Sequence, residues 1–129
     1  MAGKFALIID DEPDITTYHE ALLSDHGWQV QTANSGDDGL ALARERKPDV
    51  ILLDVMMPER GGLSTLIGFR KDPELQTVPV VLVTGIQETL KQDFGAFLDR
   101  FKNYNPDGYV EKPIDPDKLL ALLDDITGD

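Results

Sequence analysis

Three uninterrupted apolar runs constrain what this chain can fold into. They lie at residues 5–9, 50–53 and 78–83, and none shows the alternation of polar and apolar side chains that a half-exposed strand requires. Short runs without alternation are typical of strands buried on both faces, as in parallel sheets covered by helices. Two weaker strands are predicted at residues 29–33 and 108–110.

Segments with apolar residues at helical spacing fill the gaps between these strands. The first helix begins at Pro13, a residue that a first turn tolerates, and Gly27 ends it. Four more helices are predicted at residues 37–47, 63–70, 94–104 and 116–126. Strand and helix therefore alternate five times along the chain. This order predicts an α/β fold with an open parallel sheet and helices on both of its faces.

The first helix carries an apolar stripe and a histidine. Ile15, Tyr18 and Leu22 recur at helical spacing. His19 lies within the helix and His26 just after it. Both histidines are expected to be solvated polar residues rather than phosphoryl donors.

Length and charge limit the classes of function. A chain of 129 residues suits one compact domain, so residues 1–129 are predicted to be a single unit. The net charge of −12 argues against direct binding to nucleic acid, which depends on Lys and Arg, and against binding to anionic membranes. The absence of cysteine excludes disulfides and thiolate metal sites. No apolar run is long enough for a bilayer or a secretion signal, so we expect a cytoplasmic protein.

Polar residues follow the predicted strands where each strand ends. Asp10 and Asp11 follow the first strand, Asp54 the third, Thr84 the fourth and Lys112 the fifth. Ligands of open parallel sheets bind beyond the carboxyl ends of the strands. We therefore expect these carboxylates, the hydroxyl and the ammonium group to meet at one edge of the sheet.

This set of groups suits phosphoryl chemistry. Clustered carboxylates repel one another unless a cation lies among them, and Mg²⁺ prefers carboxylate and phosphate oxygens. A lysine can help to neutralise a phosphoryl group, a threonine hydroxyl can donate a hydrogen bond to it, and a carboxylate can be the nucleophile. Each residue also has a structural explanation: Asp10 or Asp11 could cap the first helix, and Lys112 could be solvated. Their joint occurrence at strand ends favours function.

The chain resembles the receiver domains of two-component response regulators, and the resemblance spans nearly its whole length. Five motifs occur in the family's order: Asp10-Asp11; residues 27–42; residues 48–58 with Gly62; residues 79–85; and residues 108–113. The resemblance implies a single receiver domain over residues 1–129. It also implies the CheY-like, flavodoxin-like fold, with a five-stranded parallel sheet of order 2-1-3-4-5 and five helices on its two faces.

The resemblance assigns roles to individual acidic residues. It implies that Asp54 is the phosphoacceptor. Asp11, Asp54 and the backbone carbonyl of Met56 would bind Mg²⁺ directly, and Asp10 would contribute through a metal-bound water. The side chain of Met56 would either screen the site from water or merely fill space.

The resemblance also assigns roles to residues at the ends of the fourth and fifth strands. Thr84 and Lys112 would bind the phosphoryl oxygens, and Gly85 leaves room for its backbone to approach them. Tyr109 matches the aromatic switch residue, which moves as Thr84 shifts toward the phosphate. The bond between Lys112 and Pro113 is a candidate cis peptide.

These roles imply a signalling module rather than an enzyme, although one that catalyses its own phosphorylation and dephosphorylation. The donor would be a sensor histidine kinase or a phosphotransfer protein. The face formed by the fourth helix, fifth strand and fifth helix would contact a downstream protein, an output domain or a second copy in a homodimer. Whether the chain acts alone or belongs to a larger regulator or hybrid kinase stays open.

One region departs from the family pattern. The stretch between Thr84 and Lys112 is longer than usual, and Asn105-Pro106 precedes the fifth strand. Four aromatic residues form a stripe there that is more typical of a core face than of an interface. They are Phe94, Phe97, Phe101 and Tyr104.

Three other functions compete with the phosphoacceptor. A phosphorylation-independent, receiver-like interaction module would need none of the acidic residues, Thr84 or Lys112. A hydrolase of the haloacid dehalogenase type would carry an Asp-x-Asp-x-Thr pattern, which residues 10–14 do not match. A flavodoxin-like cofactor binder would need a loop rich in Ser, Thr or Gly where this chain has Asp10-Asp11-Glu12.

Overall fold

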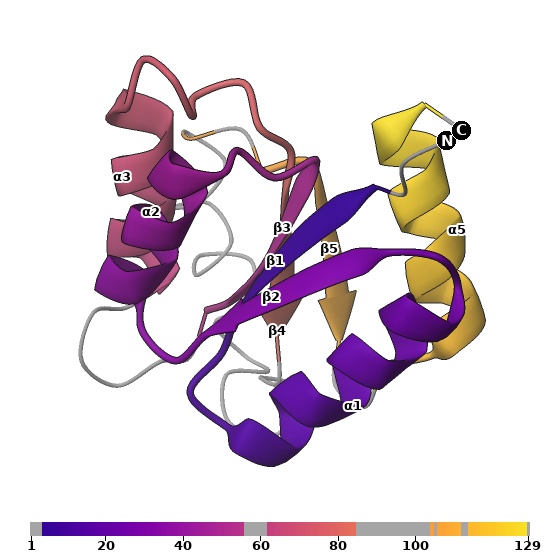
Figure 1. The fold of residues 1–129 in the computed structure, drawn as a ribbon. Helices are drawn as coiled ribbons and strands as arrows, with labels where there is room; N and C mark the ends of the chain where they lie inside the picture. The colour runs from indigo at the N-terminus through magenta and orange to yellow at the C-terminus, as the bar shows by residue number, and fades with distance from the viewer. Residues whose placement is uncertain (1–3, 56–61, 85–103, 105, 112–113, 129) are drawn as a thin grey trace, which may run out of the picture.

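Five parallel strands form one sheet in a computed structural model, which describes residues 4–55, 62–84, 104, 106–111 and 114–128. The strand order is β2-β1-β3-β4-β5 (Figure 1). The strands are β1 (Phe5–Ile9), β2 (Gln29–Ala33), β3 (Val50–Asp54), β4 (Val80–Thr84) and β5 (Gly108–Glu111). The predicted parallel sheet and its order are confirmed.

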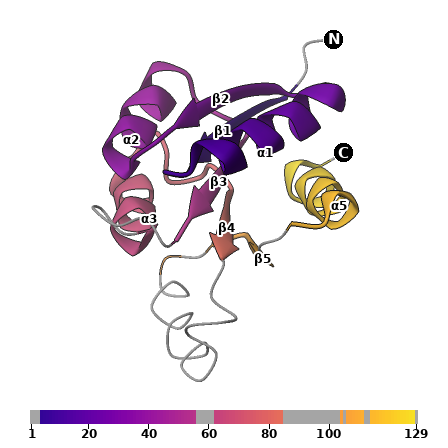
Figure 2. The same ribbon diagram turned by 90° about the horizontal axis from the view of Figure 1, so that it is seen from below.

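Helices cover both faces of this sheet. They are α1 (Pro13–Asp25), α2 (Gly36–Glu45), α3 (Gly62–Lys71) and α5 (Pro116–Thr127). Helices α2 and α3 lie on one face, and α1 and α5 lie on the other (Figures 1 and 2). Of the helix predicted at residues 94–104, only Tyr104 belongs to the described residues, where it lies in a turn. None of the helices in the described ranges has the length and apolar character needed to cross a membrane.

The three apolar runs become the buried centre of the sheet. Every residue of β1, β3 and β4 is buried, whereas the edge strands β2 and β5 are largely exposed or half-buried. Alternate residues of each central strand supply opposite faces: Leu7 and Ile9 pack toward α2 and α3, and Ala6 and Ile8 toward α1 and α5. The absence of alternation thus reflects two cores, one on each side of the sheet.

The prediction that His19 is a solvated residue was wrong. His19 and Leu23 are its buried residues, with His19 only 2% exposed, whereas Tyr18 is 47% exposed and Ile15 and Leu22 are half-buried. A helical repeat of apolar residues shows that a face exists, but neighbouring positions differ by only about a quarter of a turn. The path of the loop from β1 to α1 sets the rotation of α1 about its own axis. In this rotation His19 and Leu23 face the sheet. His26 is exposed as expected, and its Nδ1 donates a hydrogen bond to the Leu22 carbonyl at 2.9 Å.

Two element boundaries also shift. Helix α2 ends at Glu45 rather than at residue 47, and Arg46 is extended. Pro48 disfavours helical backbone at Lys47, so the helix could not have included that residue readily. Strand β4 begins at Val80, since Val78 still belongs to the preceding turn and its amide donates to the Leu75 carbonyl at 3.0 Å.

Candidate functional site

The register of the sheet brings Asp10 and Asp54 to neighbouring positions. Ile9 of β1 pairs with Leu53 of β3, so the residue that follows each of them lies at the same level of the sheet. Both side chains are buried, with Asp10 3% exposed and Asp54 2% exposed. Two aspartates that are 44 residues apart in sequence thereby share one pocket at the carboxyl edge.

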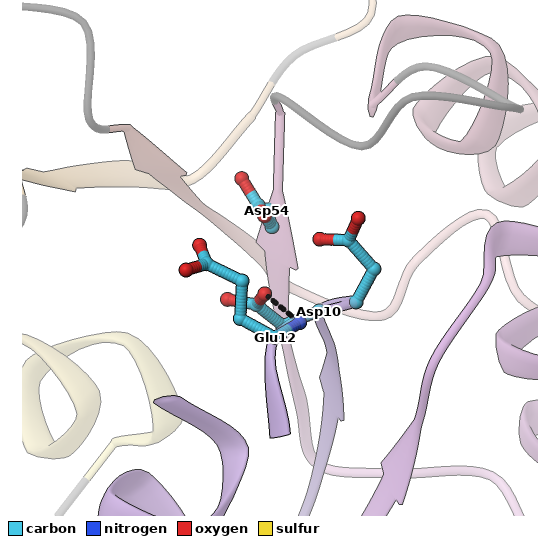
Figure 3. Close-up of side chains that lie close together, drawn as sticks. Asp10, Glu12 and Asp54 are labelled. Atoms are coloured by element: carbon cyan, nitrogen blue, oxygen red, sulfur yellow. Dashed lines mark hydrogen bonds between the residues drawn. The ribbon is translucent and has the colours of Figure 1, made fainter. Parts of the chain in front are cut away.

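The loop after β1 completes this cluster with Asp11 and Glu12, which are exposed. One carboxylate oxygen from each of Asp10, Asp11, Glu12 and Asp54 lies within 4.8 Å of the others. Figure 3 shows the Asp10, Glu12 and Asp54 side chains gathered around one space at the end of the strands. Glu12 was not among the predicted site residues. Glu12 belongs to the acidic run after the first strand, but the prediction took only the two residues that directly follow that strand.

The spacing of these oxygens fits a small divalent cation. Ligands of Mg²⁺ lie about 2.1 Å from the ion, so opposite ligand oxygens are about 4.2 Å apart. A group of carboxylate oxygens within 4.8 Å needs only a small inward movement to reach that arrangement. The residues present therefore fit the ion in both donor type and spacing.

Backbone hydrogen bonds hold the loop in this shape. The Asp10 amide donates to the Ala33 carbonyl at 3.0 Å, which extends the pairing of β1 with β2 by one residue. The Glu12 amide donates to Asp10 Oδ1 at 3.0 Å, which closes a tight turn (Figure 3). Helix α1 starts from Glu12, whose side chain makes no capping bond. The N-cap of α1 is thus neither Asp10 nor Asp11, so helix capping does not explain these two aspartates.

Thr84 ends β4 next to this cluster. Val83, the residue before it, pairs with Asp54, and the Thr84 side chain is buried. The Thr84 hydroxyl donates to the Val110 carbonyl of β5 at 3.4 Å, which is long for a hydroxyl donor. The hydroxyl therefore lies between β4 and β5 in a weak interaction.

Tyr109 lies on the edge strand β5, paired with Leu82, and is 38% exposed. The structure thus brings together Asp10, Asp11 and Asp54, and it aligns Thr84 with them at the next strand end. Met56, Gly85, Lys112 and the Lys112–Pro113 peptide lie outside the described residues, so their predicted roles stay predictions.

Similar proteins agree with this arrangement. Residues 6–124 match the model of the response regulator receiver domain. PilH of Pseudomonas aeruginosa is 37% identical over 117 residues, which cover 91% of this chain and 92% of PilH. The transcriptional regulatory protein DltR of Streptococcus agalactiae is also 37% identical over 117 residues, but the match spans only 49% of DltR.

Solved structures show the same fold. A putative response regulator from Chloroflexus aurantiacus superposes with a TM-score of 0.86 at 25% identity, covering 98% of this chain and 99% of that one. The chemotaxis protein CheY4 of Vibrio cholerae gives a TM-score of 0.84 at 28% identity, covering 97% and 99%. The chain belongs to the receiver domain family of two-component response regulators.

Proposed function

We propose that Asp54 accepts a phosphoryl group from a histidine kinase or a phosphotransfer protein, in a reaction that requires Mg²⁺. The observation that carries this proposal is the cluster of carboxylates: Asp54 and Asp10 are buried side by side, with Asp11 and Glu12 oxygens within 4.8 Å. Burying like charges together is unfavourable unless the site exists to bind a cation.

Asp54 is better placed as the nucleophile than the other acidic residues. It belongs to the central strand β3, and the amide of the next residue, Val55, donates to the Val83 carbonyl of β4 at 3.2 Å. Asp10 lies just past the end of β1, and Asp11 is exposed. In the transfer, an Asp54 oxygen bonds to phosphorus while the bond from phosphorus to the donor imidazole nitrogen breaks, and that nitrogen keeps the electron pair.

Asp11, Asp54 and the Met56 carbonyl would hold the ion, with Asp10 acting through a bound water. When bound, Mg²⁺ neutralises charge on the phosphoryl oxygens and on the surrounding carboxylates. The spacing of the four carboxylate oxygens supports a cation at this place. Glu12 joins the set as a further acidic group at the rim.

Thr84, Gly85 and Lys112 would bind the phosphoryl oxygens, and Thr84 would pass the change to Tyr109. The hydrogen bond from Thr84 to the Val110 carbonyl is long, so little is lost when the hydroxyl turns toward a phosphoryl group. That turn would release β5 next to Tyr109, whose ring is already partly exposed. Phosphorylation would thereby bias a two-state equilibrium in β5.

The domain would thus work as a cytoplasmic signalling module, with residues 1–129 forming one receiver. It would report its phosphorylated state through β5, α5 and the predicted fourth helix to a downstream protein, an output domain or a second copy. Hydrolysis of the aspartyl-phosphate would restore Asp54 and release inorganic phosphate. Its net charge of −12 opposes direct contact with nucleic acid or anionic lipid.

Incubation with phosphoramidate and Mg²⁺ tests the proposal. Intact-protein mass spectrometry should find one added phosphoryl group on the wild type and none on Asp54→Asn. Asp124→Asn, which makes the same change at an exposed position of α5, should label like the wild type. Labelling that persists in Asp54→Asn would assign the acceptor elsewhere. A wild type that no small phosphodonor labels would favour a phosphorylation-independent interaction module.

A further inference from the structure

Helix α3 begins in direct contact with the backbone of the acceptor strand. Its first residue, Gly62, is buried, and a Cβ atom built on it would lie 2.4 Å from Val55 Cα and 3.1 Å from the Asp54 carbonyl oxygen. Carbon atoms that are not bonded normally approach to about 3.5–4.0 Å. Only glycine therefore permits this separation between α3 and the peptide that joins Asp54 to Val55.

The Asp54–Val55 peptide is also held from its other side. The Val55 amide bonds to the Val83 carbonyl at 3.2 Å, and the Val55 side chain is buried in the core beneath α2 and α3. Helix α3 is fixed in turn by Leu66 and Phe69, both of which are fully buried in the same core. A side chain at position 62 must therefore displace either the backbone beside Asp54 or the whole packed helix.

We infer that Gly62 is a positioning residue for Asp54. By lacking a side chain, it lets α3 press on the Asp54–Val55 peptide and so fixes the direction of the Asp54 carboxylate relative to Asp10 and Asp11. The inference rests on the proposed function of Asp54. It adds that the acceptor is oriented by α3 as well as by the sheet.

Three other glycines in the described part of the chain differ from Gly62 in what surrounds them. A Cβ on Gly39 would meet the end of the Ile9 side chain at 2.4 Å, and one on Gly108 would meet the end of the Leu122 side chain at 3.1 Å. Both of these contacts are with side chains, whereas the contacts of a Cβ on Gly62 include the backbone of Asp54 and Val55. Gly27 has a φ of +87° and nothing within 4 Å of its Cβ position, so alanine there strains the backbone and touches nothing.

Gly62→Ala and Gly27→Ala therefore form a matched pair, since both destabilise the fold and only one touches the acceptor. Each variant is labelled with phosphoramidate at saturating Mg²⁺ and followed by intact mass, at a temperature where thermal melting shows it to be folded. We expect Gly62→Ala to label more slowly by on the order of tenfold to hundredfold, the penalty for a small misplacement of a reacting group. Gly27→Ala should label at the wild-type rate. Equal rates for Gly62→Ala and the wild type would overturn the inference.

Mg²⁺ affinity, measured by calorimetry on the same proteins, separates this inference from the proposed function. Gly62→Ala should bind Mg²⁺ more weakly than Gly27→Ala even if no protein labels, because its Asp54 carboxylate is turned away from Asp10 and Asp11. Absence of labelling in the wild type would then refute the phosphoacceptor and not the positioning role. If Gly62→Ala is unfolded, trimethylamine N-oxide is added to every sample to restore folding. Failure to fold even then would count against the inference, since Gly62 would be required by the fold alone.

Discussion

Charged side chains have different neighbours at the two ends of the sheet. At the carboxyl end, β1 and β3 bring the carboxylates of Asp10, Asp11, Glu12 and Asp54 together. At the amino end, charged side chains meet opposite charges or backbone partners: Lys4 donates to the Thr127 hydroxyl at 2.6 Å and to its carbonyl at 3.2 Å, at the C-terminus of α5. The described contacts at the amino end stabilise the fold, whereas the clustered carboxylates at the carboxyl end repel one another.

Arg70 makes several hydrogen bonds at the amino end of the sheet. It lies near the C-terminus of α3 and donates to the Tyr104 and Val78 carbonyls, each at 2.8 Å. It also pairs with Asp107 at 3.0 Å, and Asp107 in turn accepts from the Val80 amide at 2.8 Å. One side chain thus joins α3, the start of β4 and the segment that leads into β5. This network anchors the end of the region in which the sequence departs from the family.

Replacing Arg70 should give the largest change in stability. Arg70→Met leaves Asp107 without its cation and several carbonyls without their donor, and the Arg70 side chain is only 13% exposed. Asp107 is 39% exposed, so the loss comes mainly from the hydrogen bonds that the charged guanidinium makes to carbonyl oxygens. We expect about 3 kcal/mol, the upper end for hydrogen bonds that involve a charged group. Urea unfolding measures the loss, with the exposed neighbour Lys71→Met as the control. The folded variant should still label at the wild-type rate, and a slower rate would show that the two ends are coupled.

Mg²⁺ should act only at the carboxyl end. At a hundredfold excess over its dissociation constant, a ligand that binds the folded state alone stabilises it by about 2.7 kcal/mol. Mg²⁺ should therefore raise the melting temperature of the wild type, and a chelator should reverse the rise. The melting temperature of Asp54→Asn should rise less, because one negative charge among the ligands is lost. Potassium chloride at the same ionic strength controls for screening. An equal rise in both proteins would remove Asp54 from the metal site.

The smallest effect should come from an exposed ion pair at the amino end. The Arg44 side chain, hydrogen-bonded to Asp72 at 2.8 Å, lowers the pKa of Asp72 below its ordinary value of 3.8, and the Glu74 amide adds to this. A lowered pKa in the folded state stabilises the fold above that ordinary value, and the stabilisation is lost as the pH falls through the folded-state pKa. Asp72→Asn should be slightly less stable than the wild type at neutral pH.

That difference should disappear in acid, below the ordinary pKa of 3.8. Urea unfolding across this pH range measures it, with Arg44→Gln as the partner variant. A difference that persisted in acid would mean that Asp72 acts through its turn with Glu74 and not through its charge.

Much of this molecule could be predicted from local pattern. Continuous apolar runs require strands buried on both faces, and the alternation with helices requires a parallel sheet, so the carboxyl ends of the strands must meet at one edge. These rules alone predict that Asp10, Asp11, Asp54 and Thr84 lie in one region. The resemblance then singled out Asp54, which spacing alone did not distinguish from its neighbours.

The parallel sheet and its acidic edge thus follow from the order of residues, and the strand order follows from the family resemblance. Only the tertiary structure decided the rotation of α1, which buries His19 in place of Tyr18, because a helical repeat does not specify which side meets the sheet. The tertiary structure also places Glu12 in the group of carboxylates. It pairs Arg70 with Asp107, which lies 37 residues further along the chain. Such contacts depend on the path of loops and the separation of packed elements, and the close approach of Gly62 to Asp54 is of the same kind. Local periodicity carries no information about either quantity.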